Sequence, residues 1–162
     1  MAGPEGTEGP GAPARGHGSP VLWAAAACHA LAALMFVAFG VGYLARSEFL
    51  PYHRQAIGLE WKALIPSLQV LLLALMRVAG GALLGVGLAM LALLASPFRR
   101  GEAWARWAVA AVGAAAGVPA LHAVVLVRTR TPGESPVVLV VAGLACIALG
   151  FLLSLLHRPP RP

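Results

Sequence analysis

The sequence contains no aspartate and no asparagine, and it has a single lysine, Lys62, among its 162 residues. Only 11% of the residues are charged, whereas soluble domains usually carry about a quarter. This shortage of charge argues against a water-soluble globule. The two cysteines, Cys28 and Cys146, both fall inside long apolar runs, which does not suggest a disulfide framework or a zinc site.

Long apolar runs fill most of the chain, and hydrophobic residues make up 59% of it. Each of four runs is about as long as the ~20 residues that a helix needs to cross a bilayer core. The runs lack the alternation of barrel strands, so they predict helices. These predicted spans cover residues 21–45, 67–95, 107–127 and 137–156. The sequence therefore predicts an all-α membrane protein, with a four-transmembrane-helix bundle in a single domain over residues 21–158.

The two ends of the chain differ from the apolar runs. Residues 1–20 are rich in Gly and Pro, which predicts a disordered tail. Residues 159–162 form a short basic, Pro-rich tail. The first apolar run is too long for the ~7–15 residues of a signal-peptide core, so we expect it to remain as a helix.

The first loop, residues 46–66, is the longest connection and is expected to lie at the membrane interface. Pro51 can open a short helix over residues 52–57, which Gly58 would end. Its aromatic residues suit the head-group level. The interfacial residues are Tyr52, His53, Arg54, Glu60 and Trp61. A surface enzyme with His53 as base has no recognised motif to support it, so we expect no enzymatic activity.

The distribution of Lys and Arg gives a weak indication of orientation. Six arginines fall on the side of the two termini, and five basic residues fall on the other side. The second loop is short and dense in arginine, which favours cytoplasmic termini in a cell inner membrane.

Arg77 is the one charged residue inside a predicted span. Counted from Ser67 it lies ~15 Å down the helix, where a charge must face protein or water. We expect it to point into the bundle, where it either has a structural partner or binds a ligand. Its expected neighbours are His29, at similar depth, and Gln69, on a similar face of the helix. Alternatively, the part of the run that crosses the bilayer is residues 78–95, and the Arg77 side chain reaches the head groups. The first loop or a partner would then have to cover the apolar residues 70–76.

Small residues recur at four-residue spacing in two spans, which lets helices approach closely. The predicted helix-packing residues are Gly81, Gly85, Gly113 and Gly117. Arg77 falls on the same stripe as Gly81 and Gly85. No span contains an acid, which disfavours a proton-coupled exporter of cations.

Histidines in two spans raise the question of haem ligation. His29 and His122 differ by ~10 Å in predicted depth, which is a poor fit for two axial ligands of one iron. We expect polar packing residues instead, and no metal and no cofactor.

The first loop reads F-L-P-Y-H-R-Q-A-I-G-x-x-W, and the second span continues with L-M-R-V-A-G-G. With this spacing of spans the chain resembles small bacterial inner-membrane proteins of four spans. Its layout is similar to that of the DoxX-like group. The resemblance implies a bacterial membrane location and a helical bundle, and it implies no activity.

Three functions are compatible with these patterns. The first is a non-enzymatic accessory that packs against a partner subunit or a second copy through its first two spans. The second is a small transporter or binding protein for an anionic or amphipathic molecule that uses Arg77. The third is a redox subunit that holds haem or quinone. The expected surroundings are the lipid bilayer, and no nucleic-acid module is present in the sequence.

Overall fold

The computed structural model describes residues 20–156. The four long helices are α1 (Pro20–Leu44), α3 (Pro66–Leu93), α4 (Ala103–Arg130) and α5 (Val137–Leu156). Three short elements complete the chain: α2 (Pro51–Ile57), a 3-10 turn η1 (Trp61–Ala63) and a π-helical turn η2 (Leu94–Phe98). The tails predicted for residues 1–20 and 159–162 lie outside the described residues, except for Pro20, which begins α1.

The predicted all-α fold is confirmed, because residues 20–156 contain no strand. Four helices are long and apolar enough to cross a membrane, and the chain is therefore a multi-pass membrane protein. In α3 the run of helix continues through η2 to Phe98, and α4 begins four residues earlier than predicted.

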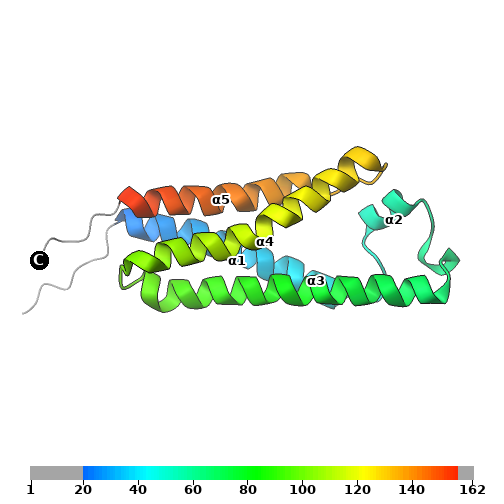
Figure 1. Ribbon diagram of the computed structural model, residues 1–162, viewed down its shortest axis with the longest axis horizontal. Helices are drawn as coiled ribbons and strands as arrows, with labels where there is room; N and C mark the ends of the chain where they lie inside the picture. The colour runs from blue at the N-terminus through cyan, green and yellow to red at the C-terminus, as the bar shows by residue number, and fades with distance from the viewer. Residues whose placement is uncertain (1–19, 157–162) are drawn as a thin grey trace, which may run out of the picture.

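Figure 1 shows the four long helices side by side, with the first and last described residues at the same end of the bundle. We call this the termini end and the opposite one the loop end. Helix α1 packs against α3 and α5, and α4 packs against α5 and α3.

Glycines allow the closest of these approaches. A Cβ atom on Gly80 would lie 2.9 Å from the carbonyl oxygen of Gly40, and one on Gly87 would lie 2.8 Å from the carbonyl oxygen of Ala33. No side chain fits at these α1–α3 crossings. Gly150 has the same role in α5, where a Cβ would lie 2.9 Å from the ring of His29.

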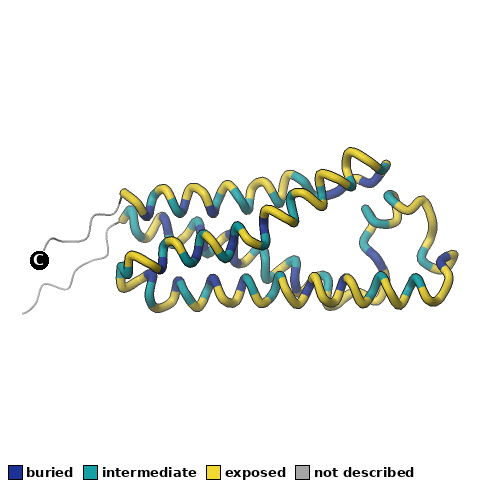
Figure 2. Tube along the Cα trace, in the orientation of Figure 1, coloured by how far each residue is buried: buried dark blue, intermediate teal, exposed yellow. Residues whose placement is uncertain are grey.

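The bundle is closed and well packed at its termini end, where Figure 2 shows buried positions on all four helices. The core residues here are Ala25, Ala32, Ala33, Met90, Leu94, Phe98, Ala105, Val109 and Ile147. Many are alanines, so the backbones lie close together. Interfacial aromatic and basic side chains mark this end, including Arg99, which lies 5.4 Å from the ring centre of Trp23.

At the loop end the bundle opens. The second half of α4, after Pro119, diverges from α3 in Figure 1, and α4 has no buried residue after Gly117. A proline inside a helix removes a backbone hydrogen bond and bends the helix. Two residues of α2, Tyr52 and His53, lie beside the diverging parts of α3 and α4.

Candidate functional site

We call three adjoining cavities at the loop end, all lined by Tyr43, the loop-side chamber. The first lies between α1, α4 and α5, the second between α3 and α4, and the third between α3 and α2. Their volumes are about 90, 410 and 260 Å³. Tyr43 lines all three cavities, which makes it the point where they meet. A further cavity at this end, lined by Arg128, shares Pro136 and Leu139 with the first of them and is not included in the chamber.

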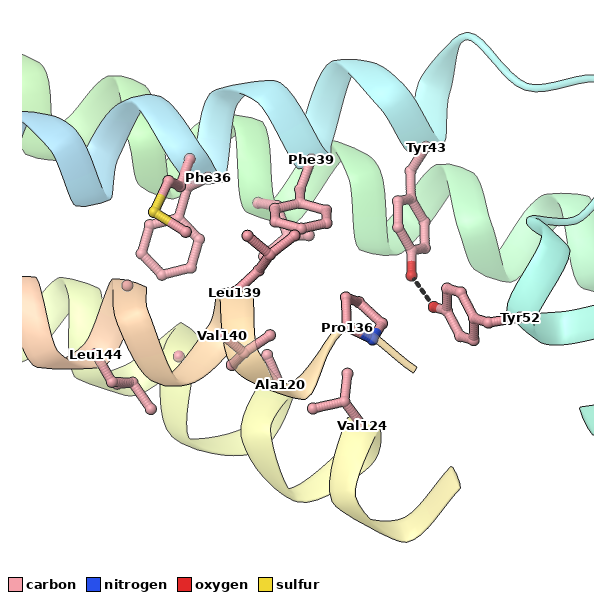
Figure 3. Close-up of a pocket in the computed structure, with 14 residues that line it drawn as sticks. Phe36, Phe39, Tyr43, Tyr52, Ala120, Val124, Pro136, Leu139, Val140 and Leu144 are labelled. Atoms are coloured by element: carbon pink, nitrogen blue, oxygen red, sulfur yellow. Dashed lines mark hydrogen bonds between the residues drawn. The ribbon is translucent and has the colours of Figure 1, made fainter. Parts of the chain in front are cut away.

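The wall of the chamber is almost entirely apolar. Figure 3 shows the first cavity, with Phe36, Phe39, Leu139 and Leu144 projecting between the helices. None of the described residues that line the chamber is Asp, Glu, Lys or Arg. An apolar cavity of this kind, with a few polar groups, is the usual form of a small-molecule site in a protein.

The polar groups of the chamber gather at one end. The hydroxyl groups of Tyr43 and Tyr52 are hydrogen-bonded to each other at 2.5 Å (Figure 3). His53 lines the second and third cavities, and its ring centre lies 4.1 Å from that of Tyr52. The backbone N–H of Leu50 donates to Nδ1 of His53 at 3.4 Å.

Burial keeps Tyr52 and His53 uncharged. It lowers the pKa of His53, and it raises the pKa of Tyr52, an effect to which the hydrogen bond with Tyr43 adds. Since an imidazole normally titrates near 6.5 and a phenol near 10, both groups are neutral at neutral pH. The polar end of the chamber therefore offers hydrogen bonds without charge.

Helix α2 carries Tyr52 and His53, and its local sequence explains its form. Pro51 opens the helix, and Gly58 ends it in the left-handed conformation with φ 73°. The loop between α4 and α5 holds this helix in place: the backbone N–H of Glu134 donates to Oε1 of Gln55 at 2.9 Å. Next to this bond, a Cβ on Gly133 would lie 2.7 Å from the carbonyl oxygen of Tyr52.

The predicted interfacial loop therefore has two faces. Arg54 and Glu60 lie on the outside and form an exposed ion pair at 3.6 Å. Trp61 packs edge-on against Phe49, with ring centres 5.1 Å apart. Tyr52 and His53 face the chamber, which the sequence analysis did not predict.

Arg77 does not lie in the middle of the bundle. Helix α3 with η2 has 33 residues, about 50 Å, whereas α5 has 20 residues, about 30 Å. The two helices are level at the termini end (Figure 1). Roughly the first 13 residues of α3 therefore project beyond the start of α5, and Arg77 is among them.

The residues near Arg77 also place it toward the loop end of the bundle. Gly80, one turn further along α3, packs against Tyr43 and Leu44 at the end of α1. The Arg77 side chain is exposed, and it belongs to neither of the ion pairs found within residues 20–156. The expectation of a buried Arg77 is therefore wrong. The position favours the alternative in which the guanidinium reaches the head groups.

The predicted cluster of Arg77, His29 and Gln69 does not form. Gln69 instead donates from Nε2 to the backbone carbonyls of Trp61, at 2.8 Å, and Leu64, at 3.3 Å. It fixes the first loop against the start of α3. Phe49, Leu64 and Met76 form a second apolar cluster there, so the loop covers part of the projecting segment.

His29 lies in the closed half of the bundle, fully buried and edge-on to Phe98, with ring centres 5.7 Å apart. His122 is exposed on α4. The two histidines are therefore not placed as two ligands of one haem iron. Within the described part of the chain, no group of three or more His, Cys, Asp or Glu residues could hold a metal ion.

The glycines predicted to pack helices divide into two pairs. Gly113 and Gly117 lie against Ile147 and Leu144 of α5. Gly81 and Gly85 are exposed, and a Cβ added at either would meet nothing within 4 Å. Within this chain the second pair does not pack helices together, because the face of α3 that contacts α1 is the neighbouring one, which carries Gly80 and Gly87.

Sequence reasoning also missed Tyr43, Pro136 and Ala120 as lining residues of the chamber. The spacing of Tyr52, His53 and Ala56 places them on one face of a short helix, which was the available signal.

Comparisons with protein-family models, with curated proteins and with solved structures found no match for this chain, so its likeness to the DoxX-like group stays a prediction.

Proposed function

We propose that this membrane protein binds an amphipathic molecule in the loop-side chamber, and that its role is non-enzymatic. The observation that supports ligand binding is the combination of an apolar chamber with a polar end made by Tyr43, Tyr52 and His53. The apolar part of a ligand would replace lipid contacts of the lining residues. The polar end would fix its orientation.

Lateral access supports an origin of the ligand in the lipid. The second cavity is lined by α3 and by the second half of α4, which diverge from each other. A molecule dissolved in the membrane could reach the chamber between these helices without crossing an aqueous phase. The likeness of the span layout to small bacterial proteins supports a bacterial inner membrane as the location of this protein. Arg99, Arg100 and Arg106 at the termini end favour cytoplasmic termini.

Filling the chamber tests this function. Ala120 lines the first two cavities, so Ala120→Phe should occupy the space where a ligand would lie. Ala115 is exposed on the same helix, and Ala115→Phe is the matched control. The measurement is photo-labelling in vesicles with two diazirine-bearing single-chain probes, a palmitic acid and a monoacylglycerol, followed by mass spectrometry of the labelled peptides.

We expect at least one probe to label chamber residues of α1 or α5 more strongly than the outward residues Leu149 and Leu152. Ala120→Phe should remove most of this labelling, and Ala115→Phe should leave it unchanged. Equal labelling of inward and outward residues by both probes would contradict the proposed function.

A partner-binding role is a second candidate, and the exposed face of α3 favours it. This face carries Arg77, Gly81 and Gly85 together with the exposed Val78. Two copies that crossed in parallel on this face would bring two Arg77 side chains together. Charge complementarity therefore favours a different membrane protein, one that offers an acidic group to Arg77.

A further inference from the structure

The chamber's polar end also restricts the chemistry of the ligand, on the condition that the proposed function holds. We infer that the bound molecule presents an uncharged carbonyl oxygen to Tyr43, Tyr52 and His53. Three observations carry this inference: the hydrogen-bond donors left over at the polar end, the absence of charged lining residues, and the positions of the arginines outside the chamber.

The tyrosine pair has one hydrogen to spare. When two hydroxyl groups bond to each other, one donates and the other accepts, so the hydrogen of the accepting group remains available. The mutual bond is the one hydrogen bond of either hydroxyl within residues 20–156. One O–H group can therefore donate to an acceptor in the chamber.

His53 supplies a second donor. Its Nδ1 accepts the N–H of Leu50, so in the neutral ring the hydrogen is on Nε2. Because His53 lines the second and third cavities, this N–H is available at the same end of the chamber as the tyrosine pair. Two donors and no charge match an oxygen that only accepts, such as a ketone, quinone or ester carbonyl.

A charged head group would fit poorly. A carboxylate or phosphate would find no cation, because the chamber is lined by no Lys or Arg among the described residues. Arg54 is exposed and paired with Glu60, and Arg77 lies on another face of α3. Arg128 lines a different cavity, between α4 and α5. An ammonium group would equally lack an acid. A buried charge without a partner is costly, so a neutral head is favoured.

The rest of the ligand must be apolar. Tyr43 and Phe36 are separated by two turns of α1, about 10 Å, and both line the first cavity. Gly117 and Gly143 line its inner end together with Met35. A chain bound along this path would keep its carbonyl at Tyr43. Two kinds of membrane molecule share this chemistry, a quinone with an isoprenoid tail and a neutral glycerol ester.

Thermal unfolding of the purified full chain in a maltoside detergent, which has no carbonyl group, tests the inference. The probes are decylubiquinone, monoolein, oleic acid at a pH where it is ionised, and a long-chain hydrocarbon without an acceptor. A ligand that binds the native protein raises its melting temperature. We expect a rise with decylubiquinone or monoolein, which identifies the source, and little change with oleate or the hydrocarbon.

The double variant Tyr43→Phe with Tyr52→Phe removes both hydroxyls, so it leaves neither unpaired. It should bind the effective carbonyl probe about tenfold more weakly. Thr129→Val is the control, because the Thr129 hydroxyl bonds only carbonyls of its own helix, outside the chamber.

The outcomes separate the two proposals. If oleate or the hydrocarbon stabilises the wild-type protein as well as the carbonyl probes do, and Ala120→Phe removes the effect, the carbonyl inference is overturned and the proposed function stands. If no probe stabilises the protein, both fail. The comparison among probes needs the wild-type chain alone, so it remains decisive even if the double variant does not fold.

Discussion

His29 shows what a single residue costs in the closed half of the bundle. It is fully buried, and neither ring nitrogen has a hydrogen-bond partner within residues 20–156. Its ring instead packs edge-on to Phe98 and against Gly150. A buried polar group without a partner destabilises a fold by about 1–3 kcal/mol. The His29 ring therefore fits its neighbours by shape, although its two nitrogens have no hydrogen bonds within the described residues.

Replacing this histidine should stabilise the protein. His29→Leu removes the unpartnered nitrogens and keeps a side chain of similar volume, so we expect a gain of about 1–2 kcal/mol. Thermal unfolding in detergent measures the change, and His122→Leu on the exposed side of α4 is the control with little effect. A lower melting temperature for His29→Leu would mean that the ring has a polar role in the native protein.

Residues of the site were predictable only where the local pattern specified them. Gly58 after a short helix was expected to end it, and it does so with φ 73°. The depth of Arg77 was not predictable, because an apolar run longer than the bilayer fits several registers. The tyrosine pair was hidden for another reason: it joins two elements, and nothing in either segment alone indicates the contact.

Helix α3 illustrates how adjacent residues take different roles within one element. Gly80 and Gly87 lie against α1, whereas Gly81 and Gly85 lie on an open face. A helix that is apolar on all sides gives no periodic signal for the face that contacts its neighbours. The spans could thus be predicted from sequence, but the packing faces required the tertiary arrangement.

The open face can be tested separately from the fold. Gly81→Leu with Gly85→Leu should leave the bundle intact, since neither position contacts anything, while Gly80→Leu should disrupt the α1–α3 crossing. If this face binds a partner, a photo-crosslinker at Val78 should yield an adduct in native membranes. The double variant and Arg77→Glu should lose the adduct, and Arg77→Lys should keep it.

Two results would speak against that arrangement. An adduct with twice the mass of the chain would indicate a second copy in place of a different protein. An adduct of unchanged intensity in the double variant would show that Gly81 and Gly85 are not part of an interface.

As a whole, the molecule has a closed half that is held by small residues and an open half that is covered by a loop. Apolar runs of suitable length predict the four spans and their order. An even number of spans then brings the start of α1 and the end of α5 to the same end of the bundle. The apolar runs do not predict the chamber, because it forms where α4 diverges after Pro119 and where Tyr52 and His53 of α2 lie beside it. Such a space depends on how several elements meet.

Orientation in the membrane is a property of the entire chain. Reporter fusions after residue 20 and in the loop between Phe98 and Ala103 should give cytoplasmic signals, and a fusion in the first loop should give a periplasmic one. A periplasmic signal from the Phe98–Ala103 loop would reverse the orientation. The chamber would then open toward the cytoplasmic leaflet.

The unequal lengths of α3 and α5 create a hydrophobic mismatch around the protein. Lipids beside α5 meet an apolar surface about 30 Å tall, whereas the apolar surface of α3 continues beyond Arg77 through the exposed Leu75, Leu71 and Val70. Each ångström of mismatch costs a fraction of a kcal/mol, and tilt or local thickening relieves it. Lipids with longer acyl chains would cover more of α3 and bring the head groups closer to α2. The thickness of the surrounding bilayer thus determines how deeply the Tyr43–Tyr52 pair is immersed.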